Sequence, residues 1–395
     1  MIEYDFDAPV DRRGTDSLKW NVADEELPLW VADMDFRTAP AVIDALRRRV
    51  EHGVFGYSVV LDSWRDAYRV WWRERHDIEL ERDWLVFCTG VVPALSSIVR
   101  KLTCPGEKVL VQTPVYNIFF NSIVNNGRFV EESPLAYRDG IYEMDFGDLE
   151  RRLADPQVTL MILCNPHNPV GRVWSRKGLA RVGELAWKHG VTVVSDEIHC
   201  DLTVPGADYV PFASASPACL LNSVTCVAPT KAFNLAGLQT AAVVVPNEAL
   251  RAKVERGLNT DEVAEPNAFA CLAAETAFGE GGPWLDGLRA YLAENRASAA
   301  AYLARELPEA RLVDAQATYL LWIDCRALCD DARELAAFVR ERTGLVLCAG
   351  EDYGEAGRGF LRMNVACSRS VLEDALALLK AGAEMWSARN RPPTA

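Results

Sequence analysis

The chain has 395 residues, of which half are hydrophobic and a quarter are charged. This composition is typical of a globular protein and excludes a disordered, collagen-like or coiled-coil chain. Lys and Arg number 42 against 56 Asp and Glu, so the formal net charge is −14. Such a surface repels phosphate backbones and anionic lipid, so we expect neither nucleic-acid binding nor membrane-surface binding.

Two further features bear on the compartment. The amino-terminal run MIEYDFD lacks the basic and apolar regions of a secretory signal, and no apolar run is long enough to span a bilayer. The eleven cysteines are scattered without a CxxC pair, which is typical of free thiols in a reducing compartment. We therefore expect a soluble cytoplasmic protein. Cys325 and Cys329 could share a helix face, but with five His in the chain we predict no metal site.

The first two thirds of the chain alternate between two patterns. Helical spacing of apolar residues predicts helices over 43–50 and 61–75, the second capped by Asp62 or Ser63. Short apolar runs then alternate with helical segments: strands at 84–88, 108–111, 160–164 and 191–195, and helices at 94–101, 118–125 and 178–189. Gly190 is placed to end the last of these helices in the left-handed conformation. Near-continuous apolar strands between amphipathic helices indicate a mostly parallel sheet covered on both faces.

The pattern changes near Pro283. A long helix is predicted over 284–306, followed by strands at 318–324, 346–348 and 360–365, a helix at 333–342, a last helix from Leu372 and a loose tail at 390–395. We therefore predict a large α/β domain over 46–283 and a smaller α+β domain over 284–395. The N-terminal segment, 1–45, is expected to pack on the small domain.

One lysine stands out by its surroundings. Lys231 is alone in the uncharged, small-residue run APTKAFNLAG at 228–237. Burying an ammonium costs several kcal/mol unless it is neutralised or paired. A lysine whose pKa is lowered in this way can form a Schiff base with an aldehyde. The alternative is a surface lysine on a loop.

Three further segments follow predicted strands. Asp196 lies at the carboxyl end of a strand, where ligand groups collect in parallel sheets, although it could equally cap a helix. The run CNPHNPVG at 164–171 forms a turn around Asn168. The run CTGVVPAL at 88–95 leads through Gly90 into a helix start, which offers free backbone N–H groups to a phosphate. Each signal is weak alone.

Taken in order, the phosphate turn, the Asn-Pro turn, the Asp after a strand and the lone Lys resemble the fold-type I pyridoxal 5′-phosphate (PLP) enzymes, the aspartate aminotransferase superfamily. The runs WVADMDF (30–36), HGVFGYS (52–58), DEIH (196–199) and GRGFLRMN (357–364) look like its cystathionine β-lyase branch, the MalY/PatB-type C–S lyases. The similarity extends from Asp11 to Leu379. It implies PLP as cofactor and an aspartate-aminotransferase-like α/β fold, with a mostly parallel seven-stranded sheet in the large domain and a smaller α+β domain.

The resemblance also implies roles for individual residues. Lys231 holds the cofactor and moves the Cα proton of the substrate, Asp196 pairs with the pyridine nitrogen, and Asn168 bonds the ring O3′. Tyr116 stacks on the ring, and Arg362 clamps the substrate α-carboxylate. The structural alternatives are a core position for Tyr116 and a structural ion pair for Arg362.

Further cofactor contacts follow from the same resemblance. Val91 and Val92 offer backbone N–H groups to the phosphate, and Thr230 adds a hydroxyl. Tyr57 reaches the phosphate of the neighbouring subunit, which implies a homodimer with shared active sites; plain dimer packing is the alternative. His199 stands near O3′, where many aminotransferases carry a tyrosine, and both a cofactor contact and a structural role are open.

Two features stay outside this assignment. Many aminotransferases place Arg or Lys eight residues after the Schiff-base lysine to pair with the phosphate, but here that position is Gln239. The neutral residue weakens the case for an ordinary aminotransferase. Asp33 and Asp35 lie in a segment that approaches the substrate in relatives. As cap or turn carboxylates they need no catalytic role, so we leave them out of the predicted site.

The predicted reaction is PLP-dependent β-elimination from an L-cysteine S-conjugate, a small-molecule amino-acid substrate, to a thiol, pyruvate and ammonia. A thiol with a pKa of about 8.5 leaves as thiolate with little acid help. The alternatives are an aminotransferase on the same fold, a decarboxylating or oxidative PLP enzyme acting on a similar conjugate in secondary metabolism, and a non-catalytic regulatory or binding protein. The sequence does not determine the S-substituent.

Overall fold

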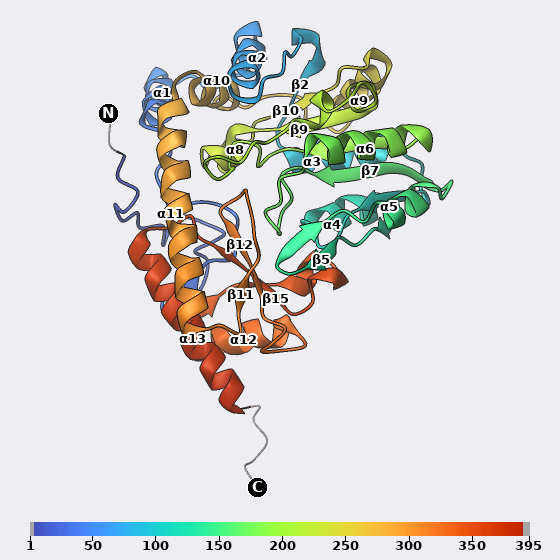
Figure 1. The fold of residues 1–395 in the computed structure, drawn as a ribbon. Coiled ribbons are helices and arrows are strands. Elements are labelled where there is room, and N and C mark those ends of the chain that lie inside the picture. Colours follow the sequence, from blue (N-terminus) through green and yellow to red (C-terminus); the bar gives the residue numbers. More distant parts are fainter. Residues whose placement is uncertain (1–3, 390–395) are drawn as a thin grey trace.

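The computed structural model describes residues 4–389, so the tail expected at 390–395 lies outside the described residues. Figure 1 shows two bodies, an upper one built on a large sheet and a lower one around β12 and β15, with the long helix α11 (Gly282–Glu306) running from one to the other. Within the described residues, no helix is both long and apolar enough to cross a membrane.

Seven strands form the large sheet, in the order β2–β10–β9–β8–β7–β3–β4. Their bounds are β2 Leu85–Cys88, β3 Lys108–Val111, β4 Phe129–Glu132, β7 Val158–Cys164, β8 Thr192–Asp196, β9 Ser223–Val227 and β10 Ala241–Val244. Every pairing is parallel except the two made by β10, which runs antiparallel to β2 and β9. The predicted fold, a mostly parallel seven-stranded sheet, is confirmed.

Helices cover both faces of this sheet, because alternate residues of its central strands are apolar on either side. Along β7, Leu160 and Ile162 pack in one core with α3 (Val91–Leu102), whereas Met161 and Leu163 pack in another with α6 (Arg176–Lys188). The other elements of the upper body are α1 Pro40–His52, α2 Asp62–His76, α4 Ile118–Val124, β5 Ala136–Arg138, β6 Ile141–Glu143, α5 Phe146–Leu153, α7 Pro217–Leu221, α8 Pro229–Ala232, α9 Glu248–Thr260 and α10 Ala270–Glu280.

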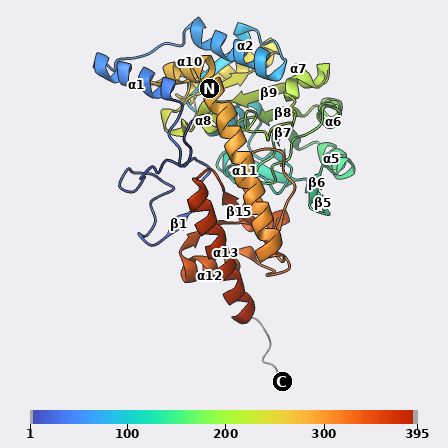
Figure 2. The same cartoon turned by 60° about the vertical axis from the view of Figure 1, so that its left-hand side comes forward.

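The lower body contains an antiparallel sheet in the order β11–β12–β15–β14. Its elements are β11 Arg311–Leu312, β12 Leu320–Asp324, α12 Ala332–Thr343, β13 Leu345–Val346, β14 Cys348–Ala349, β15 Phe360–Asn364 and α13 Arg369–Arg389. Residues of β12, β15, α12 and α13 share one hydrophobic core. The N-terminal strand β1 (Leu27–Pro28) pairs in parallel with β13, and Figure 2 shows the blue N-terminal segment running beside this body.

The sequence located most of these elements but not all. The strand predicted over 346–348 is divided between β13 and β14. Of the large sheet, the sequence predicted β2, β3, β7 and β8 but not β4, β9 and β10, and it did not predict α5, α7, α8, α9 or α10. The expected cap of α2 is wrong, since the helix begins at Asp62 itself and no side chain caps it. Gly190 does adopt the left-handed conformation, with φ 70°. The sequence therefore located the strands that precede Asn168 and end at Asp196, but not β9, which precedes Lys231.

A buried amide joins α11 to the chain that follows β15. Asn295 is fully buried, and its Nδ2 donates to the carbonyl oxygens of Val365 (3.0 Å) and Cys367 (2.9 Å). Replacing Asn295 by Leu leaves both carbonyls without this donor, so we expect the free energy of unfolding to fall by about 2–3 kcal/mol. Thermal or urea unfolding measures the change. Ala297→Gln, at an exposed position of the same helix, is the control, and an equal loss in both variants would contradict the prediction.

Candidate active site

A cavity of about 270 Å³ lies where β3, β7, β8 and β9 end. Eight of the ten predicted site residues line it: Val91, Val92, Tyr116, Asn168, Asp196, His199, Thr230 and Lys231. Arg362 approaches from the lower body, with its Nη1 3.4 Å from Oδ1 of Asn168. Tyr57 is fully exposed and is not brought to the cavity of its own chain.

Lys231 lies on the short helix α8, just after β9. Its Nζ donates a hydrogen bond to the carbonyl oxygen of Ala32. Burial lowers the pKa of Lys231 to about 8; the charge of Arg362 acts in the same direction, while Asp33 and Asp196 oppose it. A substantial fraction of the amine is therefore neutral near physiological pH, which is the form that attacks a carbonyl.

Asp196 is the last residue of β8. One of its carboxylate oxygens accepts a hydrogen bond from the backbone N–H of Ile198 at 3.1 Å. Burial raises the pKa of Asp196 to about 7, and the charge of Glu197 adds to this, while the hydrogen bond and Lys231 oppose it. No cationic side chain within residues 4–389 forms a salt bridge with it. A protonated ring nitrogen would supply the partner that this carboxylate lacks.

The opposite end of the cavity suits an anion. Val91 and Val92 are the first two residues of α3, and Gly90 at its N-cap position supplies no capping side chain. Their N–H groups belong to the first turn, where a helix has no internal acceptors and carries a partial positive charge. Thr230 and Gln239 also line this cavity. Among the described lining residues only Lys231 is cationic, so backbone and hydroxyl groups would hold a phosphate.

Arg362 lies in the middle of β15 and is almost fully buried. Its Nη2 donates to the carbonyl oxygen of Trp30 at 2.8 Å, and its guanidinium lies 4.8 Å from the ring centre of Tyr353. Its Nε has no hydrogen-bond partner, and no carboxylate of the described residues pairs with it. The guanidinium is thus free to bind a carboxylate anion through its planar fork.

Two aromatic residues flank these groups. His199 is buried, and its Nδ1 has no hydrogen-bond partner. Burial lowers the pKa of His199 to about 3, and the charges of Lys231 and Arg362 add to the effect, so the imidazole stays neutral. Tyr116 lines the cavity while its ring also meets Phe119 edge-on at 5.8 Å. It is both a core residue and a wall of the site.

The sequence analysis did not foresee how strongly the strip 30–36 is fixed against the cavity. Asn234, three residues after Lys231, donates to the carbonyl oxygens of Met34 (2.9 Å) and Phe36 (3.0 Å). Asn364 donates to the carbonyl oxygens of Val31 and Asp33 from the end of β15. Both asparagines lie in runs that the sequence had already singled out, but an isolated Asn carries no signal that its amide holds a distant segment.

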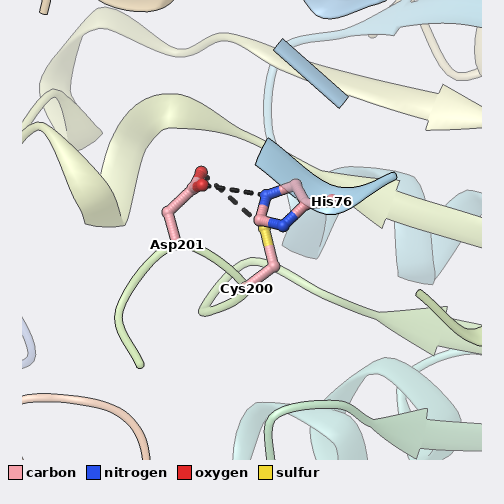
Figure 3. Close-up of side chains that lie close together, drawn as sticks. All are labelled: His76, Cys200 and Asp201. Carbon is pink, nitrogen blue, oxygen red and sulfur yellow. Dashed lines mark hydrogen bonds and ion pairs between the residues drawn. The ribbon is translucent and has the colours of Figure 1, made fainter. Parts of the chain in front are cut away.

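A second polar cluster lies away from the cavity, where the end of α2 meets the chain after β8. Figure 3 shows His76 and Cys200 both directed at the carboxylate of Asp201, with His76 Nε2 2.9 Å from Oδ1 and Cys200 Sγ 3.8 Å from Oδ2. Trp71 Nε1 also donates to Oδ1 at 3.0 Å. These hydrogen bonds occupy the carboxylate and tie α2 to the connection that carries His199.

Comparison with known proteins identifies the family. The model of the aminotransferase class I and II family matches residues 25–379. Cystathionine β-lyase PatB of Bacillus subtilis (strain 168) is 45% identical over 382 residues, which span 95% of this chain and 99% of PatB. The chain belongs to the class I and II aminotransferase family.

Two further matches place it within that family. Protein MalY of Escherichia coli (strain K12) is 35% identical over 384 residues, 95% of this chain and 97% of MalY. The crystal structure of cystalysin from Treponema denticola, which contains PLP, matches with a TM-score of 0.94 and 32% identity over 97% of this chain and 100% of cystalysin. The predicted branch, that of the PatB/MalY-type lyases, is confirmed: the protein is a PLP-dependent carbon–sulfur lyase of the cystathionine β-lyase type.

The cavity fits this cofactor at three points. The buried Asp196 carboxyl lacks a cationic partner, the first turn of α3 has free N–H groups, and the Lys231 amine lies in the same cavity. These three groups match a ring nitrogen, a phosphate and an aldehyde. Lys231, Asp196 and the first turn of α3 are therefore the groups of this chain that would hold PLP.

The lowered pKa of Lys231 predicts how cofactor-free protein takes up PLP. Only the neutral amine attacks the aldehyde, so the rate constant of reconstitution should rise with pH and level off above about 8. Stopped-flow absorbance at a series of pH values measures this profile. A rate that keeps rising toward the ordinary lysine value of 10.5 would show that the amine is not perturbed.

Proposed function

We propose that the protein cleaves the Cβ–S bond of an L-cysteine S-conjugate by β-elimination and releases a thiol, pyruvate and ammonia. The observation that carries this proposal is the convergence of three groups on one small cavity: the Lys231 amine, the buried Asp196 carboxyl and the unpaired Arg362 guanidinium. Its relatives named cystathionine β-lyase support the reaction class.

When bound, PLP supplies an aldehyde for amines and a ring that accepts the electron pair released at Cα. The chain supplies the remaining functions. Arg362 binds the α-carboxylate of the substrate in a bidentate manner, which fixes the direction of the Cα–H bond. Lys231, once its amine is free, removes the Cα proton as a general base.

The substrate supplies its own leaving group. A thiolate departs from Cβ without a strong acid nearby, because the pKa of a thiol is about 8.5. This agrees with a site whose imidazole, that of His199, stays neutral and is a poor proton donor. When PLP is bound, the Asp196 carboxylate would keep its ring nitrogen protonated, and Asn168 and Tyr116, which line the same cavity, would hold the ring.

The assignment predicts separate effects for two variants. Lys231→Ala should lower kcat for release of thiol and pyruvate from L-cystathionine or an S-alkyl cysteine by about 10²–10⁴-fold, because the general base is lost. Arg362→Lys should mainly raise KM, because an ammonium cannot form the bidentate pair. Coupled lactate dehydrogenase and a thiol reagent measure the two products.

Arg358 is exposed and lies just before β15, the strand that carries Arg362. Arg358→Lys is therefore the matched control and should leave kcat and KM unchanged. Amino-group transfer to an added keto acid, without thiol release, would instead identify an aminotransferase. Loss of carbon dioxide from the substrate carboxyl would indicate the decarboxylating alternative.

We further propose that the active protein is a homodimer in which Tyr57 completes the partner's phosphate site. The segment between α1 and α2 is extended and exposes Val54, Phe55, Tyr57 and Val59. A run of exposed apolar side chains of this kind is typical of an interface with another protein surface. Val92, at the end of the cavity that suits a phosphate, is also exposed, so this end is open to a hydroxyl donor from a second chain.

Hybrid dimers test this arrangement. If Tyr57 acts across the interface, a dimer of one Lys231→Ala chain and one Tyr57→Ala chain has one site with both defects and one intact site. Mixing the two weakly active variants under exchange conditions should therefore restore activity to a fraction of the wild-type value. Sedimentation measures the dimer, and a mixture that remains as weak as its components would refute the shared site.

A further inference from the structure

Two aspartates of the strip 30–36 form a charged network with two cations from the segment before it. Arg12 forms a bidentate pair with Asp33 (Nη1–Oδ1 3.0 Å, Nη2–Oδ2 2.7 Å) and also contacts Asp35 at 2.8 Å. Lys19, which is fully buried, binds the other oxygen of Asp35 at 2.7 Å. Trp20 adds a third donor to Asp35 at 2.8 Å.

The two carboxylates of this network are not equivalent. Asp35 has two cations and an indole N–H, whereas Arg12 is the only cation that pairs with Asp33 among the described residues. The charge that Asp33 presents to its surroundings therefore depends on a single guanidinium. Because both pairs are largely shielded from water, screening by solvent is weak.

Asp33 lies next to the point where the strip contacts the catalytic lysine. The carbonyl oxygen of Ala32, the preceding residue, accepts hydrogen bonds from Lys231 Nζ and from the hydroxyl of Tyr319 (3.0 Å). Asn364 fixes the backbone of Asp33 by a bond to its carbonyl oxygen. The backbone of Asp33 is thus held directly beside the residue that the amine contacts, while Arg12 holds its carboxylate.

Of the other groups around the amine, Arg362 is charged, whereas Asp196, whose pKa is raised to about 7, is only partly ionised near neutral pH. Arg362 disfavours the protonated amine, and Asp196 favours it. His199, whose pKa is lowered, and the phenols Tyr116 and Tyr319, whose pKa values are raised, are uncharged. Asp33 is the remaining charge, and it acts on Lys231 in the direction that retains the proton.

We propose that Asp33 and Arg12 are positioning residues that set the proton affinity of Lys231, Asp33 raising it and Arg12 limiting that effect. This inference rests on the proposed role of Lys231 as the group that holds the cofactor and moves the Cα proton. A base that must both take and return a proton works best with a proton affinity matched to the working pH. The pair supplies this adjustment from outside the cavity.

The test uses two variants that should act in opposite directions. Asp33→Asn removes the negative charge, so the protonation constant of the Lys231 nitrogen should fall by roughly threefold to tenfold. Arg12→Gln exposes the Asp33 charge, so the same constant should rise by a similar factor. In the double variant, Arg12→Gln should add almost no further change to that of Asp33→Asn, because its effect acts through Asp33.

Two readouts report this constant. A pH titration of the visible absorbance of the holoenzyme follows the nitrogen of Lys231 in its link to PLP. Competitive labelling of cofactor-free protein with a small amine reagent, read at the Lys231 peptide by mass spectrometry, follows the free amine. Arg13→Gln is the matched control. Arg13 fixes the same N-terminal segment through the carbonyl oxygens of Ala23 and Asp24 but pairs with neither Asp33 nor Asp35.

The outcomes separate this inference from the proposed function. Unchanged protonation constants in both Asp33→Asn and Arg12→Gln would overturn it. It would also be overturned if both variants and the control Arg13→Gln shifted the constant in the same direction, because a general loosening of the segment affects all three variants alike. Borohydride reduction of the wild-type holoenzyme that attaches PLP to a peptide without Lys231 would refute the proposed role of Lys231 instead. If Arg12→Gln does not fold, an Asp33→Asn constant equal to that of the wild type still refutes the inference.

Discussion

The structure depends on the burial of an amine among groups of opposite charge. Lys231 is held among Arg362, Asp33 and Asp196, and burial rather than any single neighbour is the main cause of its lowered pKa. A buried charge without such compensation would cost several kcal/mol. The elements around the cavity therefore have to be placed accurately.

The parallel sheet provides this accuracy at its carboxyl edge. β7, β8 and β9 run in the same direction. Asn168 and Lys231, which follow β7 and β9, and Asp196, the last residue of β8, therefore emerge at one edge. The lower body contributes only Arg362, but it does so from the middle of a strand in which every residue is buried. The substrate carboxylate would thus be bound where the two bodies meet.

The strip 30–36 contacts both the site residues of the large sheet and those of the lower body. Its carbonyl oxygens accept hydrogen bonds from Arg362 at Trp30, from Lys231 at Ala32 and from Asn364 at Val31 and Asp33. A displacement of this strip would move the amine and the guanidinium together. The charged network of Arg12, Lys19, Asp33 and Asp35 holds the strip in place, and the charge of Asp33 acts on Lys231.

The sequence by itself indicated a mostly parallel α/β fold through apolar strand runs of limited length. The lone lysine and the turns that follow strands predicted a site only when taken together, through their resemblance to a known family of enzymes. Only the tertiary structure decided the hydrogen bonding of the strip 30–36 and the pairing of Arg12 with Asp33. It also decided the cluster of His76 with Asp201, whose partners are 125 residues apart. Such contacts depend on how distant segments pack, and no local pattern of residue types encodes that distance.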